Sequence, residues 1–180
     1  MGTSGGQGDA LLVATCESCA FVRLKGKGSI RTSSALKRFL TNMAGKGYRL
    51  FTFDMGECRG MDSTFMGVLA GFVSKLKTMG GGRVVMVNVD DAIYELLHTL
   101  GLDRLIENDR HGELEPELIQ RISQVVSLSA LNIGEESKDV AADTVLSAHE
   151  ALADVSPDNH DRFKDVLAFL RKETRHDDTR

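Results

Sequence analysis

The sequence has no tryptophan and is poor in other aromatic residues and in proline. Its 180 residues include two tyrosines, eight phenylalanines and two prolines. Proteins that bind single-stranded nucleic acid stack bases on aromatic side chains, and this chain offers few of them. With 42% hydrophobic and 27% charged residues, the composition excludes collagen-like, wholly disordered and disulfide-scaffold chains. The length suits one domain, or one domain with an appendage.

A surplus of basic residues is also absent. The net charge is -4, and lysine and arginine are scattered along the chain, so no basic patch for a polyanion is expected. No apolar run is long enough to cross a bilayer. The N-terminal MGTSGGQGDA lacks the features of a signal peptide, and Gly6 stands where N-myristoylation requires serine or threonine. We therefore expect a cytoplasmic protein with a flexible segment over residues 1–9, without membrane insertion or direct nucleic-acid binding.

Cysteine is scarce, since Cys16, Cys19 and Cys58 are the only three. An odd number without an export signal suggests reduced thiols. The C-x-x-C pair lacks the second pair of ligands that a metal site needs, and it lacks the strand-to-helix turn of a redox motif. Because strand-like residues flank it on both sides, we interpret Glu17 and Ser18 as a hairpin turn. No metal or cofactor is expected.

Strand-like and helix-like patterns alternate over about the first 107 residues. Strands are predicted over residues 10–18, 19–28, 49–55 and 83–89. Helices are predicted to begin near residues 32, 63 and 92 and to stop at Gly45, at the glycines after Met79 and at Gly101. The first helix has three candidate N-caps, Thr32, Ser33 and Ser34, and Asp90 or Asp91 can cap the third. Alternating strands and helices imply right-handed crossovers. We therefore expect an α/β domain over residues 10–112, with a mixed sheet that has a largely parallel centre and is packed by helices.

The pattern after residue 112 is helical. One helix is predicted over residues 116–133, where Leu118, Ile122, Val125 and Ser129 form a stripe that packs on the domain. Two more helices, over 137–154 and 157–172, form a helical hairpin within an extension over residues 113–175, followed by a tail at 176–180. Their apolar faces must be buried on a neighbour, on the core or on another chain. A homodimer through these helices is therefore a hypothesis.

Asp62, Ser63 and Thr64 stand at the start of the second predicted helix. A serine in this place is ordinarily a helix cap, and a hydroxyl placed for chemistry is the alternative. Asp54, at the end of a predicted strand, lies at the edge where α/β sites collect, or caps a loop. Met66 can fill the core or add an adaptable partner surface. No serine, histidine and carboxylate set has an assignable geometry, so no catalytic residue is expected.

Residues 49–107 resemble the STAS domain of bacterial anti-sigma factor antagonists. The shared pattern is a strand that ends in Asp, a short loop, Asp-Ser-Ser/Thr at a helix start, a Gly-Val-Leu run, a glycine stop, a valine-rich strand and a helix that ends in Leu-x-Leu-Gly-Leu-Asp. In this chain these are Asp54, Asp62-Ser63-Thr64, Gly67-Val68-Leu69, Gly80-Gly81-Gly82, Val84–Val89 and Leu100-Gly101-Leu102-Asp103. The first two strands and the first helix fit the family loosely.

The resemblance implies a STAS-like fold and a regulatory binding protein without catalysis. In the family, the first hydroxyl of the motif is phosphorylated by a partner that is both a serine kinase and an anti-sigma factor. The unphosphorylated form sequesters that partner and so frees the sigma factor, and a serine phosphatase is a further expected partner. Carried over, the phosphoacceptor is Ser63, with Thr64 as the alternative. The expected partner-binding residues are Asp54, Asp62, Ser63, Thr64, Phe65 and Met66.

The chain departs from the family at two places. Phe65 stands where the family usually has glycine, and it is large enough either to join the core or to alter the surface that a partner contacts. The family's Asp after the second strand is absent. The alternative is a STAS subunit that docks constitutively on a transporter or another assembly without a serine switch. The intact Asp62-Ser63-Thr64 favours the switch, and Phe65 and the helical extension favour the docking subunit.

Overall fold

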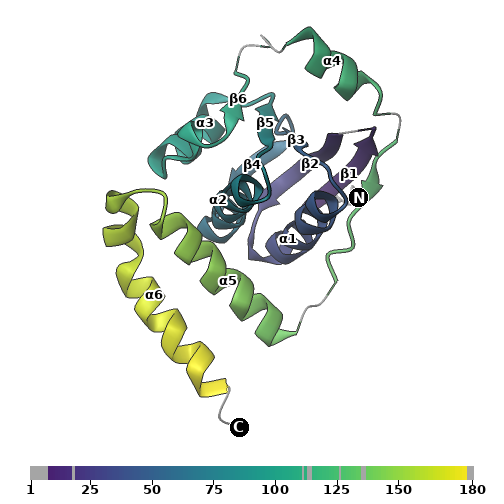
Figure 1. Ribbon diagram of the computed structural model, residues 1–180. Helices are drawn as coiled ribbons and strands as arrows, with labels where there is room; N and C mark the ends of the chain where they lie inside the picture. Colours follow the sequence, from purple (N-terminus) through teal and green to yellow (C-terminus); the bar gives the residue numbers. More distant parts are fainter. Residues whose placement is uncertain are drawn as a thin grey trace, which may run out of the picture.

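The computed structural model describes residues 8–17, 19–110, 112, 115–125, 127–134 and 137–177 (Figure 1). Within these ranges the strands are β1 (Ala10–Cys16), β2 (Cys19–Gly28), β3 (Leu50–Asp54), β4 (Cys58–Met61), β5 (Arg83–Val87), β6 (Glu107–Asn108) and β7 (Ser129–Ala130). The helices are α1 (Ile30–Gly45), α2 (Ser63–Thr78), α3 (Asp91–Thr99), the 3-10 turn η1 (Leu102–Arg104), α4 (Pro116–Ser123), α5 (Lys138–Ala153) and α6 (Pro157–Asp177). Most of the expected flexible N-terminus, Ser18 of the expected turn and the end of the expected tail lie outside the described residues.

The strands form a mixed sheet in the order β6-β5-β3-β2-β1-β7, with β4 also paired to β2. The strands β2, β3, β5 and β6 are parallel to one another, and β1 is antiparallel to both of its neighbours. The predicted α/β class and the largely parallel centre are therefore confirmed. The short strands β4, β6 and β7 were not predicted, because two to four residues carry too little periodicity to show a strand.

Both faces of the central sheet are covered by helices. On one face, Val84 and Met86 of β5 belong to the main core together with buried residues of α1, α2 and α3. On the other face, Val85 and Val87 pack against Leu118 of α4. Successive side chains of a strand point to opposite faces, so burial on both faces explains why β5 is a nearly continuous apolar run.

Three sequence predictions about helix limits are wrong. The last helix, predicted to end near residue 172, continues to Asp177, so α6 takes in the start of the expected tail. The helix α1 begins at Ile30 and not after a cap at residues 32–34. Its N-cap is Ser29, whose backbone N–H donates to Thr32 Oγ1, and the N–H of Ile30 donates to the carboxylate of Asp62, far away in the sequence. The helix predicted over residues 116–133 ends at Ser123. Ser129 belongs to β7 instead, where it pairs with Val13 at the open edge of β1. The error at Ser129 comes from tertiary pairing that overrides local pattern, whereas the start of α1 combines a local contact between Ser29 and Thr32 with the tertiary contact from Asp62.

The C-terminal hairpin, which consists of α5, α6 and the turn between them, forms a further layer (Figure 1). The turn has the predicted cap, since the N–H of Asn159 donates to the hydroxyl of Ser156 at 3.2 Å and Pro157 begins α6. Figure 1 shows α5 lying along α2, with α6 beside α5 on the side away from the sheet. The side chains of Phe163 and Leu167 are buried, so the apolar face of α6 is largely covered within the chain. None of the helices in the described ranges is both long enough and apolar enough to span a bilayer.

Candidate functional site

The carboxylate of Asp62 closes the N-termini of two helices. Its Oδ1 atom accepts a hydrogen bond from the N–H of Phe65 in α2, and its Oδ2 atom accepts one from the N–H of Ile30 in α1, both at 2.8 Å. The backbone N–H of Asp62 donates to the carbonyl of Gly28 at 2.8 Å. Unpaired N–H groups at a helix start attract an anion, so one carboxylate here satisfies donors of both helices. Asp62 therefore fixes the local geometry around the next residue, Ser63.

Ser63 is the first residue of α2 and is partly buried. Its Oγ atom lies 3.1 Å from Nε2 of His149, which belongs to α5. Nδ1 of His149 lies 2.8 Å from the carbonyl oxygen of Val145 and therefore carries a proton. In the neutral imidazole, Nε2 is then an acceptor, and Ser63 donates its hydroxyl proton to it. No pattern in the sequence indicates this pairing.

The three residues after Ser63 face the interior. Thr64, Phe65 and Met66 are 6%, 0% and 5% exposed, because α2 turns them toward the core. In this conformation they offer little surface to a partner, so their part in partner binding stays a prediction. The sequence leaves open whether Phe65 joins the core or alters the partner surface, and in the structure it lies in the core. Within the Asp-Ser-Thr motif, Ser63 is thus more accessible than Thr64.

The core position of Phe65 depends on a glycine in β2. A Cβ atom on Gly28 would lie 2.7 Å from two carbons of the Phe65 ring, which is closer than real side chains approach. Gly28 is not at positive φ, so its role is to leave room. Phe65 and Gly28 are therefore linked by shape.

Asp54 lies at the end of β3 and is 8% exposed. Its carboxylate accepts hydrogen bonds from Asn88 Nδ2 at 2.8 Å, from the N–H of Gly56 at 3.1 Å and from Arg23 Nε at 2.8 Å. Burial alone disfavours the charged form, but these three donors outweigh it and lower the pKa of Asp54 below its ordinary value. Asp54 thus holds three chain segments together, and its place in a partner surface stays a prediction.

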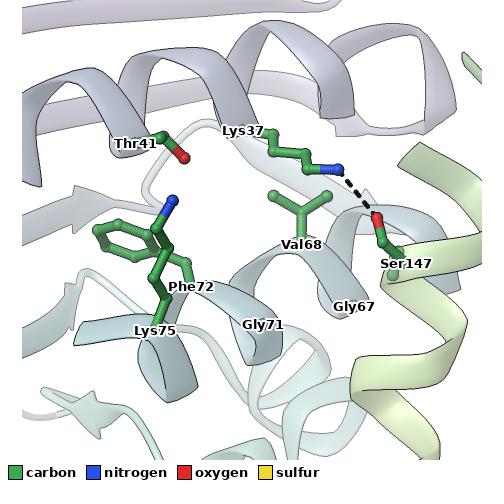
Figure 2. Close-up of a pocket in the computed structure, with 9 residues that line it drawn as sticks. Lys37, Thr41, Gly67, Val68, Gly71, Phe72, Lys75 and Ser147 are labelled. Carbon is green, nitrogen blue, oxygen red and sulfur yellow. Dashed lines mark hydrogen bonds between the residues drawn. The ribbon is translucent and has the colours of Figure 1, made fainter. Parts of the chain in front are cut away.

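The helix α5 approaches α2 closely at two glycines. A Cβ atom on Gly67 would lie 2.2 Å from the carbonyl oxygen of Ala148, and one on Gly71 would lie 3.3 Å from Cβ of Ala151. Beside this contact is a hollow of about 210 Å³ between α1, α2 and α5 (Figure 2). The side chains of Lys37 and Lys75 stand over its floor, which includes both glycines.

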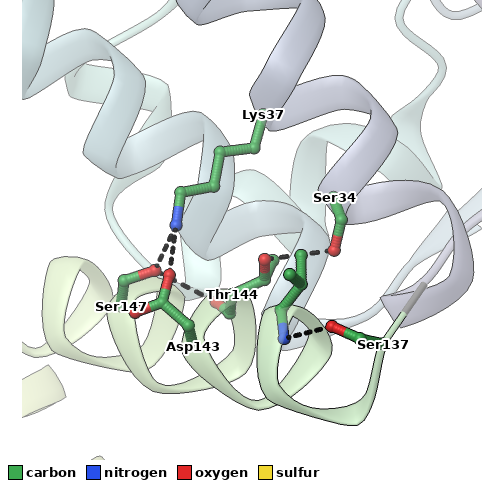
Figure 3. Close-up of polar contacts among 7 residues, drawn as sticks. Ser34, Lys37, Ser137, Asp143, Thr144 and Ser147 are labelled. Carbon is green, nitrogen blue, oxygen red and sulfur yellow. Dashed lines mark hydrogen bonds and ion pairs between the residues drawn. The ribbon is translucent and has the colours of Figure 1, made fainter.

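Polar contacts also join α5 to α1 (Figure 3). The buried hydroxyl of Ser34 donates to Thr144 Oγ1 at 3.1 Å. The ammonium group of Lys37 lies 3.1 Å from the carboxylate of Asp143 and 2.9 Å from the hydroxyl of Ser147. A buried, satisfied hydroxyl pair fixes register more than it adds stability. The position of α5 over α1 and α2 is therefore specific.

The cysteines are free in the structure. Cys16 and Cys19 are partners in the last pair of the β1–β2 ladder, as expected for residues that flank a hairpin turn. Burial raises the pKa of Cys19, and separately that of Cys58, to about 11. A thiol with such a pKa is protonated at neutral pH and is a poor nucleophile or metal ligand. Within the described ranges, no three His, Cys, Asp or Glu side chains are grouped as metal ligands would be.

A family model of the STAS domain matches residues 11–118, which is more than half of the chain, so the chain belongs to the STAS domain family. Among solved structures, the Thermotoga maritima protein TM1081, assigned as an anti-sigma factor antagonist, is 16% identical, with a TM-score of 0.51 over 62% of this chain and 93% of that one. An anti-sigma factor antagonist from Mycobacterium paratuberculosis is 19% identical, with a TM-score of 0.52 over 67% of this chain and 99% of that one. Identities this low establish similarity of fold alone. The comparison with curated proteins gave no match.

Proposed function

We propose that this chain is an anti-sigma factor antagonist, a non-catalytic regulatory protein of the bacterial cytoplasm. In this proposal the unphosphorylated form sequesters an anti-sigma factor with serine kinase activity and so releases a sigma factor. Phosphorylation of Ser63 by that kinase ends the sequestration, and a serine phosphatase restores it. The observation that carries the proposal is the position of Ser63, a partly buried serine at the first residue of α2 in a STAS fold.

The start of α2 suits a phosphorylation switch on physical grounds. A phosphate adds a charge of about -1.5 to -2, and the N-terminus of a helix tolerates an anion because of its dipole and its unpaired N–H groups. The α/β domain need not unfold when Ser63 is modified, although His149 of α5, 3.1 Å from the hydroxyl, has to give way. The new charge stands beside the carboxylate of Asp62, so an acidic or apolar partner surface is repelled.

The direct test is phosphopeptide mass spectrometry on the protein isolated from its native host. Phosphate on Ser63, lost in Ser63→Ala, is the expected result. Thr64 is the alternative acceptor, but its 6% exposure favours Ser63. Absence of phosphate on both residues under several growth and stress conditions contradicts the proposal.

A second candidate function is constitutive docking on a transporter or another assembly. The hydrogen bond from Ser63 to His149 favours it, since the hydroxyl is engaged within the chain. This candidate expects a stable complex that is unaffected by Ser63→Ala and contains no kinase-like anti-sigma factor. Affinity purification of the wild-type and Ser63→Ala proteins from the native host, followed by identification of the bound chains, separates the two.

A homodimer through the C-terminal hairpin is a further proposal. The structure buries most of the apolar face of the hairpin within the chain, and the large apolar side chains left exposed on α6 are Val166 and Phe169, at 41% and 62%. Pairing through α6 therefore has to use these two side chains, and on α5 Val140 is exposed as well, at 45%. Light scattering on the wild type and on Phe169→Ser tests it: a dimer mass that falls to the monomer value supports the proposal, and a monomeric wild type contradicts it.

A further inference from the structure

One face of α2 carries Ser63, Gly67 and Gly71, which are spaced by four residues and lie along the same side of the helix. We call these three residues the docking face. The C-terminal hairpin covers all three, through His149 at Ser63, Ala148 at Gly67 and Ala151 at Gly71. The proposed phosphoacceptor and its neighbours on α2 are thus beneath a segment that lies beyond the family match, which ends at residue 118.

The docking face fits a helix with small residues. The backbone of α5 at Ala148 approaches Gly67 so closely that any Cβ atom there would overlap it, at 2.2 Å from the carbonyl oxygen. Small side chains on both helices allow such an approach, since packing distance is set by the residues at the contact. A partner helix that replaces α5 must therefore present alanine, glycine or serine to Gly67 and Gly71, and a polar group to Ser63.

The residue that covers Ser63, His149 of α5, is itself covered by α6. His149 is 6% exposed, and the ring of Phe163 stands edge-on to its imidazole at a centroid distance of 5.5 Å and an angle of 73°. A phosphate on Ser63 needs room for three oxygen atoms where the imidazole now lies 3.1 Å from Oγ. A docked hairpin and a kinase bound at Ser63 are consequently incompatible.

On the basis of the proposed function, we infer that the docking face of α2 has two competing occupants: the C-terminal hairpin of the same chain and a small-residue helix of the anti-sigma partner. With the hairpin docked, the chain is autoinhibited, and Ser63 is closed both to binding and to phosphorylation. Between Ser123 at the end of α4 and Lys138 at the start of α5, the described residues form no helix, so the hairpin can leave without unfolding α1 or α2. Because coupling is reciprocal, a ligand that binds only the undocked form and the anti-sigma partner strengthen each other's binding by the same factor.

The experiment uses the full chain and two matched variants of α2. Gly67→Ala forces a Cβ atom into the backbone of α5, whereas Gly71→Ala brings two Cβ atoms to 3.3 Å, a contact that a small shift relieves. Both changes raise the helix propensity of α2 alike. In a Ser63→Cys background, the rate at which iodoacetamide alkylates the thiol introduced at position 63 is measured by site-resolved mass spectrometry, and hydrogen exchange of α5 amides is measured in parallel.

Gly67→Ala is expected to speed both alkylation of the introduced thiol and exchange of α5 by about tenfold or more, and Gly71→Ala to change them by less than about twofold. Ala148→Glu is the second variant, because it places a charge at the same contact from the α5 side and leaves α2 unchanged; the same increase is expected. Faster exchange of α5 without faster alkylation overturns the inference. So does an absence of both effects in Gly67→Ala and Ala148→Glu.

Phosphorylation in the native host separates this inference from the proposed function. Phosphoserine at Ser63 is compared in the wild type, Gly71→Ala and Ala148→Glu, each with native Ser63. A higher phosphorylated fraction in Ala148→Glu alone supports the inference. Equal fractions in all three overturn the inference and leave the proposed function standing. If none of the three proteins carries phosphate while alkylation changes as expected, the serine switch is refuted. The conclusion that the hairpin covers the docking face of α2 then still stands.

Discussion

The hydroxyl of Ser63 and Nε2 of His149 are 3.1 Å apart, although the two residues are separated by 86 positions in the sequence. This hydrogen bond joins the Asp-Ser-Thr motif of the STAS domain to the C-terminal hairpin. It satisfies the hydroxyl at the start of α2 within the chain, and so it sets the cost of exposing that hydroxyl to anything else.

The strength of the Ser63–His149 contact is measurable by a double-mutant cycle. His149→Phe keeps a ring against Phe163 but removes the acceptor, and Ser63→Ala removes the donor. We expect a coupling free energy of about 0.5–1.5 kcal/mol in urea unfolding, as for a part-buried neutral hydrogen bond. His149→Ala is the comparison that also loses the ring contact, and it should be the most destabilised. A coupling energy near zero contradicts a formed hydrogen bond in solution.

Asp62 is expected to be more important for stability than an ordinary helix cap. Asp62→Ala removes acceptors for the N–H groups of Phe65 and Ile30 at once. Each cap is worth about 1 kcal/mol, so a loss of about 2 kcal/mol in the free energy of unfolding is expected. Asp62→Asn is the matched variant: its amide keeps one acceptor oxygen and should lose about half as much. Equal stability of Asp62→Ala and Asp62→Asn argues against the two-helix cap.

The sequence predicted the parts of the fold that local patterns control. The continuous apolar run of β5 and the helical spacing of α2 were visible because burial imposes them on neighbouring residues. The start of α1 was misplaced because Thr32, which the pattern offers as a cap, is instead the residue that accepts from the backbone N–H of the true N-cap, Ser29. The strand β7 was missed because a strand of two residues depends on an edge provided by β1.

The candidate site was only partly predictable for the same reason. Ser63 and Asp62 belong to a motif that is contiguous in sequence. His149 lies on α5, and no motif around it in the sequence marks it as a site residue. Only the packing of α5 on α2 brings it to Ser63. The burial of Phe65 depends on Gly28, and nothing in the sequence links two residues on different elements.

Gly28 and Phe65 are matched in size. The effect of Gly28→Ala on stability should therefore depend on which residue stands at position 65. Gly28→Ala puts a methyl group into the Phe65 ring and should destabilise the protein by about 1–3 kcal/mol. Phe65→Ala alone should cost about 3–5 kcal/mol, because it leaves a cavity in a fully buried site. In the Phe65→Ala background, Gly28→Ala should become neutral or stabilising, because the added methyl then enters empty space. Chemical denaturation measures all four proteins, and additive effects would show that the two residues do not share space.

The pKa of Asp54 predicts how stability changes with acid. Because its folded-state pKa is lowered by Asn88, Gly56 and Arg23, the carboxylate stabilises the fold above the pKa of an unfolded aspartate, about 3.9, and this contribution is lost as the pH falls through the folded-state value. Asp54→Asn keeps an oxygen acceptor but removes the charge opposite Arg23. We expect a loss of about 1–2 kcal/mol at pH 7 that shrinks below about pH 4.

The control for Asp54 is a second acidic side chain from the adjoining loop. Glu57 lies 3.1 Å from Lys25 but is 45% exposed, so Glu57→Gln should change stability by less than about 0.5 kcal/mol. Urea unfolding of the wild type and both variants between about pH 3 and pH 7 gives the comparison, within the range where carboxylates titrate. If the difference in unfolding free energy between the wild type and Asp54→Asn stayed constant across this range, the charge of Asp54 would not be the source of its stabilising effect. Only a contribution from the ionised carboxylate changes with pH.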